Sequence, residues 1–207
     1  MQPSDPTVFI VDDDEAVRDS LGFLMKTIGA PFQTYGLAAE FLADFDLNRS
    51  GCLLLDIRMP GMSGLELQKA LARKHSILPI IFITGHGDVP MAVEAMREGA
   101  FDFIQKPFRD QDLIDCVHNA LEVDSRNRAA LIERDKVNSN LKTLTEREKQ
   151  ILSRVVDGKS NKAIAAELCL SQRTIEVHRA HVMEKMQADS VAHLVRMIVN
   201  INPEGNP

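Results

Sequence analysis

The sequence has no apolar run that approaches the roughly 20 residues needed to span a bilayer. Its start, MQPSDPTV, lacks a basic region followed by an apolar stretch, so we expect neither a membrane segment nor a secretory signal. Cysteine is scarce: Cys52, Cys116 and Cys169 are odd in number, widely spaced and set among apolar residues. This pattern argues against a disulfide framework or a cysteine metal site, and it predicts reduced core thiols in a cytoplasmic protein.

Charge is unevenly distributed along the 207 residues, which together carry a net charge of −6. Residues 1–124 contain 10 basic and 20 acidic side chains, whereas residues 125–207 contain 14 and 10. An acidic part followed by a basic part favours two domains with different partners, although random surface composition gives the same imbalance. We predict one domain at 1–124, a helical linker at 125–142 that either stands alone or extends the preceding helix, and a second domain at 143–207.

The first domain alternates short apolar runs with helical patterns. The runs, typical of buried parallel strands, lie at 7–11, 32–35, 52–55, 79–83 and 101–105, and the helical patterns lie at 15–29, 37–45, 64–74, 89–98 and 110–121. This order predicts an α/β domain with a doubly wound, five-stranded parallel sheet. On the helix at 89–98, the spacing predicts a sheet-facing side of Val89, Ala92, Val93 and Met96, with Met91, Ala95 and Glu98 elsewhere.

Polar side chains stand where the predicted strands end. Asp12 and Asp13 follow the first strand, Asp56 follows the third, Thr84 the fourth and Lys106 the fifth. In a parallel sheet these ends meet at one edge. Crowded carboxylates repel one another unless a cation lies among them, and oxygen ligands suit Mg²⁺. We therefore expect a divalent-cation site with Asp56 as a nucleophile toward phosphorus, although each residue taken singly would be a helix cap, a turn residue or surface.

These residues, together with the DIRMPGMSG segment at 56–64 and the Lys106-Pro107 pair, resemble the receiver domain of two-component response regulators. The resemblance implies a flavodoxin-like or CheY-like fold in which Asp56 is phosphorylated. It further implies that Mg²⁺, or Mn²⁺ in its place, is held by Asp12, Asp13, Asp56 and the main-chain carbonyl of Arg58.

The same resemblance implies a conformational switch. Thr84 and Lys106 contact the phosphoryl group, the Lys106-Pro107 bond is cis, and Phe103 turns inward as Thr84 moves. Asp14 is not expected among the metal ligands, because it is placed to cap the helix that starts near Glu15.

The second domain shows helical patterns at 145–157, 160–168, 172–186 and 190–200 and no strand pattern, which predicts an all-α domain of four helices. Residues 161–186 indicate a helix, a turn and a helix capped by Ser171. The second of these helices buries Ile175, Val182 and Met186, and its opposite face carries Arg173, Glu176, Val177, Ala180, His181 and Glu184. An exposed Val suits thymine methyl groups and the basic residues suit phosphates, whereas the alternative is a helical bundle with ordinary surface charge.

The stretches LTEREKQIL, GKSNKAIAAEL and SQRTIEVH resemble the LuxR/GerE-type helix-turn-helix. The resemblance implies that 172–186 is the recognition helix and that DNA is contacted by Lys162, Arg173, Thr174, Glu176, Val177, Arg179, Ala180 and Lys185. The whole chain looks closest to FixJ-type regulators. That implies a FixL-like sensor histidine kinase, a homodimer after phosphorylation, promoter DNA and RNA polymerase as partners, no membrane partner, and activation of nitrogen-fixation genes.

Two other functions remain open. A phosphohydrolase with an aspartyl nucleophile would use the same carboxylates, but position 58 is Arg rather than a second acid, and no segment for a substrate cap is evident. We therefore expect a phosphoacceptor that catalyses only its own phosphoryl transfer and hydrolysis, not an enzyme. The second alternative is a constitutive DNA-binding protein whose first domain serves only for docking.

Overall fold

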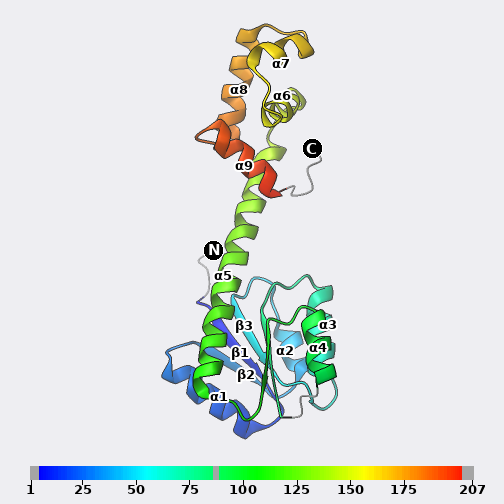
Figure 1. Ribbon diagram of the computed structural model, residues 1–207, viewed down its shortest axis with the longest axis vertical. Helices are drawn as coiled ribbons and strands as arrows, with labels where there is room; N and C mark the ends of the chain where they lie inside the picture. Colours follow the sequence, from blue (N-terminus) through cyan, green and yellow to red (C-terminus); the bar gives the residue numbers. More distant parts are fainter. Residues whose placement is uncertain (1–4, 86–88, 202–207) are drawn as a thin grey trace. The chain divides into compact units, whose positions relative to one another are not determined.

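The computed structural model describes residues 5–85 and 89–201, and the chain divides into two compact units between Arg128 and Ala129. Figure 1 shows the order of the helices and strands. The first unit has a hydrophobic core on each face of a sheet, and the second unit has a core of its own. In the described ranges, no helix combines the length and the apolar character needed to cross a bilayer.

The first unit is built on a five-stranded parallel sheet with the strand order β2-β1-β3-β4-β5. The strands are β1 (Thr7–Val11), β2 (Phe32–Tyr35), β3 (Gly51–Leu55), β4 (Ile80–Thr84) and β5 (Asp102–Gln105). Val11 lies beside Leu55, and Thr84 lies beside Gln105, so the carboxyl ends of these strands form one edge. The predicted doubly wound α/β fold is confirmed.

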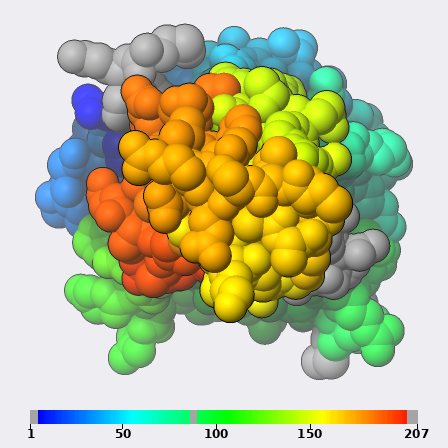
Figure 2. All heavy atoms as spheres, turned by 90° about the horizontal axis from the view of Figure 1, so that it is seen from above, coloured from blue at the N-terminus to red at the C-terminus, as the bar shows by residue number. Residues whose placement is uncertain are grey.

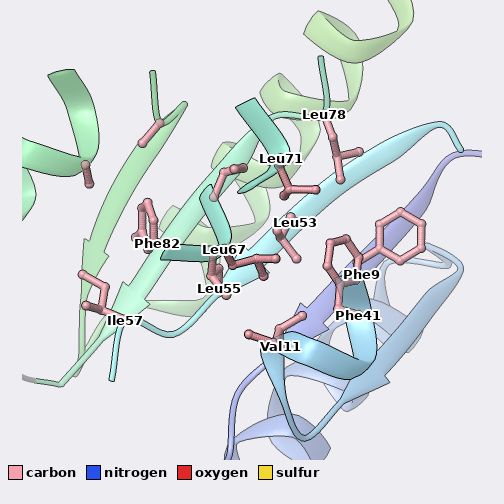
Figure 3. Packing of buried hydrophobic residues seen from close by; sticks show 14 of the residues in the cluster. Phe9, Val11, Phe41, Leu53, Leu55, Ile57, Leu67, Leu71, Leu78 and Phe82 are labelled. Atoms are coloured by element: carbon pink, nitrogen blue, oxygen red, sulfur yellow. The ribbon is translucent and has the colours of Figure 1, made fainter. Parts of the chain in front are cut away.

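Helices cover both faces of the sheet; they are α1 (Glu15–Thr27), α2 (Ala38–Asp44), α3 (Gly64–Arg73), α4 (Val89–Arg97) and α5 (Asp110–Lys142). Because alternate residues of a strand point to opposite faces, Phe9 packs in one core with α2, α3 and α4, whereas Ile10 packs in the other with α1 and α5. Figure 3 shows the first of these cores, where the rings of Phe9 and Phe41 lie 5.6 Å apart. Burial on both faces explains why β3 and the first four residues of β4 carry no polar side chain.

The predicted sheet-facing side of α4 is wrong. Ala95 is fully buried and Met91 packs against the core, whereas Val93 and Met96 are 42% and 46% exposed. The side chain of Val89 lies outside the described set. Gln68 of α3 donates its Nε2 to the carbonyl oxygen of Ala95 at 2.9 Å, which fixes this face toward the core. Both faces carry apolar residues at helical spacing, so periodicity alone does not select between them.

The last helix of the first unit, α5, runs on as a single helix of 33 residues, so residues 125–142 extend the preceding helix, which is one of the two alternatives that the sequence left open. Asp124 of α5 is completely buried, and its carboxylate accepts hydrogen bonds from Ser50 Oγ at 2.8 Å and from the Gly51 main-chain N–H at 2.9 Å. Nε of Arg128 lies 2.8 Å from the same carboxylate. We call these four residues the Asp124 cluster; through it, α5 is joined to the segment that enters β3.

The guanidinium of Arg128 extends the Asp124 cluster to the backbone. Its remaining nitrogens donate to the main-chain carbonyls of Leu47 and Arg49, the first at 3.0 Å. Asp124 and Arg128, one helical turn apart on α5, are thus held by groups that lie 73 to 81 residues earlier in the chain. The cluster lies at the opposite end of β3 from Asp56.

The second unit contains the four short helices that the sequence predicts; they are α6 (Glu146–Val156), α7 (Asn161–Leu168), α8 (Gln172–Met186) and α9 (Val191–Ile201). Thr145, Ser160 and Ser171 cap the first three, each by accepting a hydrogen bond from a main-chain N–H in the first turn. Gly158 follows α6 with a φ of +77°, the left-handed conformation that ends a helix. Figure 2 shows the surface where α7, in yellow, lies beside α8, in orange.

The three cysteines do not share one environment. Cys52 and Cys116 are buried free thiols, as predicted, whereas Cys169 is exposed, so the prediction of a core thiol is wrong at that position. Cys169 ends α7 with a φ of +54°. Its side chain projects from a turn, although both neighbouring residues in the sequence are leucines.

Candidate functional site

The predicted strand-end residues meet at the carboxyl edge of the sheet. Nζ of Lys106 lies 2.8 Å from Oδ2 of Asp12 and 3.5 Å from Oδ1 of Asp56. These three residues follow β5, β1 and β3, so they come from widely separated parts of the chain. Asp12 is buried and Asp56 is half-buried. One ammonium group therefore lies between two carboxylates in a largely desolvated place.

The surroundings of Asp56 stabilise its negative charge only in part. Burial raises the pKa of the Asp56 carboxyl above its usual range, and the negative charge of Asp12 raises it further. The Arg58 main-chain N–H and the Lys106 ammonium oppose this rise but do not cancel it. An additional cation would favour the ionised form of both carboxylates. The donor set, two carboxylates at the carboxyl edge of the sheet, is the kind that holds Mg²⁺, which needs only one or two carboxylates and keeps several waters.

The other residues predicted near the metal lie in different positions. Asp13 is exposed, and within the described residues its carboxylate does not join those of Asp12 and Asp56 in one close group. The main-chain N–H of Arg58 donates to Oδ2 of Asp56 at 2.7 Å, while the Arg58 side chain is exposed. Asp14 caps α1 by accepting from the Ala16 N–H at 2.9 Å, as predicted.

The two predicted switch residues lie on neighbouring strands. Thr84 is the last residue of β4 and is buried, and its carbonyl oxygen accepts from the Lys106 N–H at 2.9 Å. Phe103 of β5 is half-buried against the core of α2, α3 and α4, beside Phe82 in the strand register. The Lys106-Pro107 peptide bond is cis, as predicted.

Two supporting residues were not found by sequence reasoning. Arg18, one turn into α1, donates NH1 to the main-chain carbonyl of Asp12 at 2.8 Å, and no local pattern signals this contact. Gly64 opens α3 directly against Asp56: a Cβ there would lie 2.2 Å from the Asp56 carbonyl oxygen. The signal for Gly64 was present, because a glycine that follows an N-cap serine within a strand-to-helix loop indicates close backbone approach.

We expect Gly64→Ala to destabilise the first unit by about 1–3 kcal/mol, because the added methyl group forces the start of α3 away from Asp56. The displacement should also slow any reaction of Asp56. Urea unfolding measures the stability. Gly85→Ala is the matched control, since the same methyl group at Gly85 meets no atom of a described residue within 4 Å. Equal stability of the two variants would contradict this reading of Gly64.

The exposed face of α8 is the candidate nucleic-acid interface, and its composition matches the prediction. Ile175, Val182 and Met186 are buried, and the exposed residues include Arg173, Glu176, Val177, Ala180, His181 and Glu184. Val177 is 44% exposed. Lys162, near the start of α7, is exposed as well. A helix that presents a bare Val among charged side chains is suited to a groove rather than to water.

Three other predicted DNA contacts are already engaged within the unit. Arg179 NH1 donates to Oδ1 of Asn161 at 2.7 Å, and Lys185 Nζ lies 2.7 Å from Oε2 of Glu148. The Thr174 hydroxyl is 2.8 Å from that of Ser171. These contacts orient α8 against its neighbours, so the three side chains would have to exchange a partner in order to reach a phosphate.

Comparison with known proteins identifies a family for each of the two units. Residues 8–118 match the response regulator receiver domain family, and residues 142–198 match the bacterial regulatory proteins of the luxR family. The transcriptional regulatory protein FixJ of Rhizobium meliloti is 50% identical over 194 residues, covering 94% of this chain and 95% of FixJ. Nodulation protein W of Bradyrhizobium diazoefficiens is 45% identical over 199 residues, covering 96% and 88%.

A solved structure extends the likeness to the fold. The low-resolution structure of the response regulator StyR matches with a TM-score of 0.84 and 42% identity, covering 94% of this chain and 98% of StyR. The likeness to StyR thus extends over nearly the whole length of both chains. The chain belongs to the two-component response regulators that carry a LuxR-type DNA-binding domain, and it is a transcription factor rather than an enzyme.

Proposed function

We propose that Asp56 is phosphorylated by a sensor histidine kinase and that the phosphorylated chain forms a homodimer, binds promoter DNA and activates transcription. The observation that carries this proposal is the placement of Lys106 between Asp12 and Asp56. Such an arrangement fixes a nucleophilic carboxylate beside a cation at the open edge of the sheet. The family supports the kinase and the DNA as partners.

We infer the attacking oxygen from the two hydrogen bonds of Asp56. Oδ2 accepts from the Arg58 N–H at 2.7 Å, whereas Oδ1 accepts from Lys106 at the longer distance of 3.5 Å, so Oδ1 is the oxygen that would attack. A bond forms between this oxygen and phosphorus while the bond from phosphorus to the donor breaks, and the electron pair leaves with the donor. Lys106 neutralises the charge on the phosphoryl oxygens as they spread in the transition state.

Receiver domains generally use Mg²⁺ for this reaction. In this chain Asp12, Asp13, Asp56 and the Arg58 carbonyl would hold the ion, with Mn²⁺ as a substitute. When bound, it would supply additional positive charge at the phosphoryl oxygens. Asp13, being exposed, is available to the ion directly or through a water.

The response to phosphorylation is proposed to pass through Thr84 and Phe103 to the surface of α4. Thr84 would donate its hydroxyl to a phosphoryl oxygen, and Phe103 would turn inward. The exposed side of α4 contains Ala92, Val93 and Met96 around a shallow apolar depression. We propose that this surface, together with β5, docks a second receiver in the phosphorylated dimer.

The test joins three measurements on the full-length chain incubated with acetyl phosphate and Mg²⁺: protein mass, oligomeric state and promoter affinity. We expect the mass of one phosphoryl group, a shift to dimer and a rise in affinity of about 5- to 150-fold. Asp56→Ala should lose all three, and Asp19→Ala, an exposed aspartate on α1, should lose none. Equal promoter affinity with and without the donor would instead favour a constitutive DNA-binding protein.

In the second unit we propose that the exposed face of α8 enters the major groove. Arg173 and Lys162 would lie at phosphates, Val177 and Ala180 at base edges, and Glu176 would accept from cytosine N4. Thr174, Arg179 and Lys185 would add phosphate contacts after exchanging their present partners. The proposal rests on the exposure of Val177 and on the luxR-family match.

Lys162→Gln should weaken promoter binding. It should also make the negative slope of log K against log salt shallower by about 0.9, because one counterion fewer is released from the DNA. Binding titrations at several salt concentrations measure this slope. Lys26→Gln, the same change on the exposed surface of α1, should leave the slope unaltered. An equally shallower slope in both variants would rule out a specific phosphate contact at Lys162.

The likeness to FixJ supports a finer physiological proposal. We propose a FixL-like kinase, nitrogen-fixation genes as the regulon, contact with RNA polymerase at the promoter and a cytoplasmic location. The relatives differ in their roles, since one of similar identity is a nodulation protein. Expression profiling of a strain that lacks this chain tests the regulon directly. Limited proteolysis tests the proposed boundaries at 124 and 142.

A further inference from the structure

Three metal-binding side chains converge where α6 packs against α8 in the second unit. Glu148 lies in the first turn of α6, and His178 and His181 lie one helical turn apart on α8. A ligand atom of each residue lies within 4.8 Å of those of the other two. Neither the receiver site nor the proposed base contacts of α8 make use of this group, which we call the Glu148 cluster.

The carboxylate of Glu148 is held in place with one oxygen left over. Oε2 accepts from the Thr145 main-chain N–H at 2.8 Å and from the Lys185 ammonium at 2.7 Å. Oε1 lies 3.9 Å from Nδ1 of His181 and accepts no hydrogen bond from a described residue. This leaves Oε1 as the oxygen available to a metal ion.

His178 supplies an independent sign of an additional ligand. Its Nδ1 is enclosed by protein, yet it has no hydrogen-bond partner in the described part of the chain. Enclosed ring nitrogens are nearly always paired, and an ion or a water is the common explanation when the protein offers no partner. His178 thus has an unpaired ring nitrogen, and one of its two ring nitrogens lies within 4.8 Å of ligand atoms of Glu148 and His181, an arrangement suited to a metal cation.

The distances suit a small tetrahedral ion. With bonds of about 2.1 Å, two ligands of tetrahedral zinc lie about 3.4 Å apart. The 3.9 Å between Glu148 and His181 needs only a small side-chain rotation, and the His181 side chain is 53% exposed and has room for it. A carboxylate with two imidazoles is the ligand set of zinc rather than of Mg²⁺, which prefers oxygen.

We propose that Glu148, His178 and His181 bind a borderline transition-metal ion, in the first place Zn²⁺, which joins α6 to α8 with water in the fourth position. The ion draws His181 from the exposed face of α8 toward Glu148. Lys185 opposes binding, because its ammonium shares the carboxylate of Glu148. The site is independent of Asp56, since it lies in the second unit.

Full-length protein is titrated with Co²⁺ and then Zn²⁺ in excess Mg²⁺, which keeps the receiver site filled with its own ion. We expect one Co²⁺ per chain with the visible absorption of a tetrahedral complex, its displacement by Zn²⁺, and a melting temperature that rises with Zn²⁺ concentration. His181→Gln, on an exposed residue that the fold does not need, should weaken binding by at least about tenfold. Lys185→Gln should tighten it.

His193→Gln is the matched control, because His193 pairs with the carboxylate of Asp189 at 3.5 Å, and among the described residues no third metal-binding side chain joins that pair. It should bind Co²⁺ as the parent does. Unchanged affinity in both His181→Gln and His178→Gln would overturn the proposal. So would a thiolate-to-cobalt absorption band, because it would assign the metal to the exposed Cys169.

Discussion

Lys106→Gln should slow phosphorylation of Asp56 by acetyl phosphate about 100- to 1000-fold, the range observed when one preorganised donor to a developing negative charge is removed. The ammonium of Lys106 lies against both Asp12 and Asp56, and glutamine keeps a hydrogen-bond donor there but no charge. The loss should therefore lie in the rate of the chemical step. Mass spectrometry at timed intervals in saturating Mg²⁺ measures this rate.

The same variant should change the pH dependence in a fixed direction. Lys106 lowers the pKa of Asp56, so its removal raises that pKa further above the usual range. At any acidic pH a smaller fraction of Asp56 is then ionised, and only the carboxylate attacks phosphorus. The acidic limb of the rate profile should move to higher pH. If the phosphorylation rate instead falls by the same factor at every pH, Lys106 acts on the phosphoryl group alone.

Lys69→Gln is the control for both measurements. It removes the same charge from the same unit, where Lys69 pairs with Glu94 on the exposed sides of α3 and α4 at 2.8 Å. Exposed pairs of this kind contribute little, about 0–1 kcal/mol, so neither the rate nor its pH profile should change. An equal loss of rate in Lys69→Gln would show that net charge, rather than position, governs the reaction.

The largest loss of stability is expected from Asp124→Ala, at about 3–5 kcal/mol, the cost of breaking a buried ion pair by removing one partner. The change leaves Arg128 without its carboxylate, and the Ser50 hydroxyl and Gly51 N–H lose their acceptor. All of these groups lie where β3 begins. The first residues of β3, the strand that leads to Asp56, should therefore be less firmly held.

Urea unfolding followed by tyrosine fluorescence measures this effect in the full-length chain. The sequence contains one tyrosine and no tryptophan, and Tyr35 lies in β2, so the signal reports on the first unit alone. Arg126→Gln is the control, because Arg126 forms an exposed pair with Glu122 at 3.7 Å. It should cost less than about 1 kcal/mol. A similar small value for Asp124→Ala would mean that water replaces the lost carboxylate.

The sequence predicted the structure best where a local pattern was compatible with only one structure. Strands buried on both faces are apolar throughout, so β1, β3 and β4 could be placed within a residue or two. Asp14 and Ser171 were identified as caps because they precede helical patterns directly. The strand-end residues then followed from topology alone, since parallel strands present their carboxyl ends at one edge.

Other features depend on contacts between distant segments and could not be predicted. The α4 surface was reversed because Met91 and Ala95 have the same helical spacing as Val93 and Met96, and only packing against the sheet distinguishes them. The burial of Asp124 needs the segment before β3, and that of Glu148 needs Lys185 of α8. Charged residues in polar stretches give no local sign of such partners.

The unequal exposure of the three thiols makes the chain ready for site-specific labelling. Burial raises the pKa of the Cys52 thiol and raises that of Cys116 to about 12, so both remain protonated and unreactive at neutral pH. A maleimide dye should therefore attach to Cys169 alone, in the turn between α7 and α8. Native protein should thus accept a single fluorophore beside its proposed recognition helix, so that DNA docking can be followed by fluorescence without any substitution.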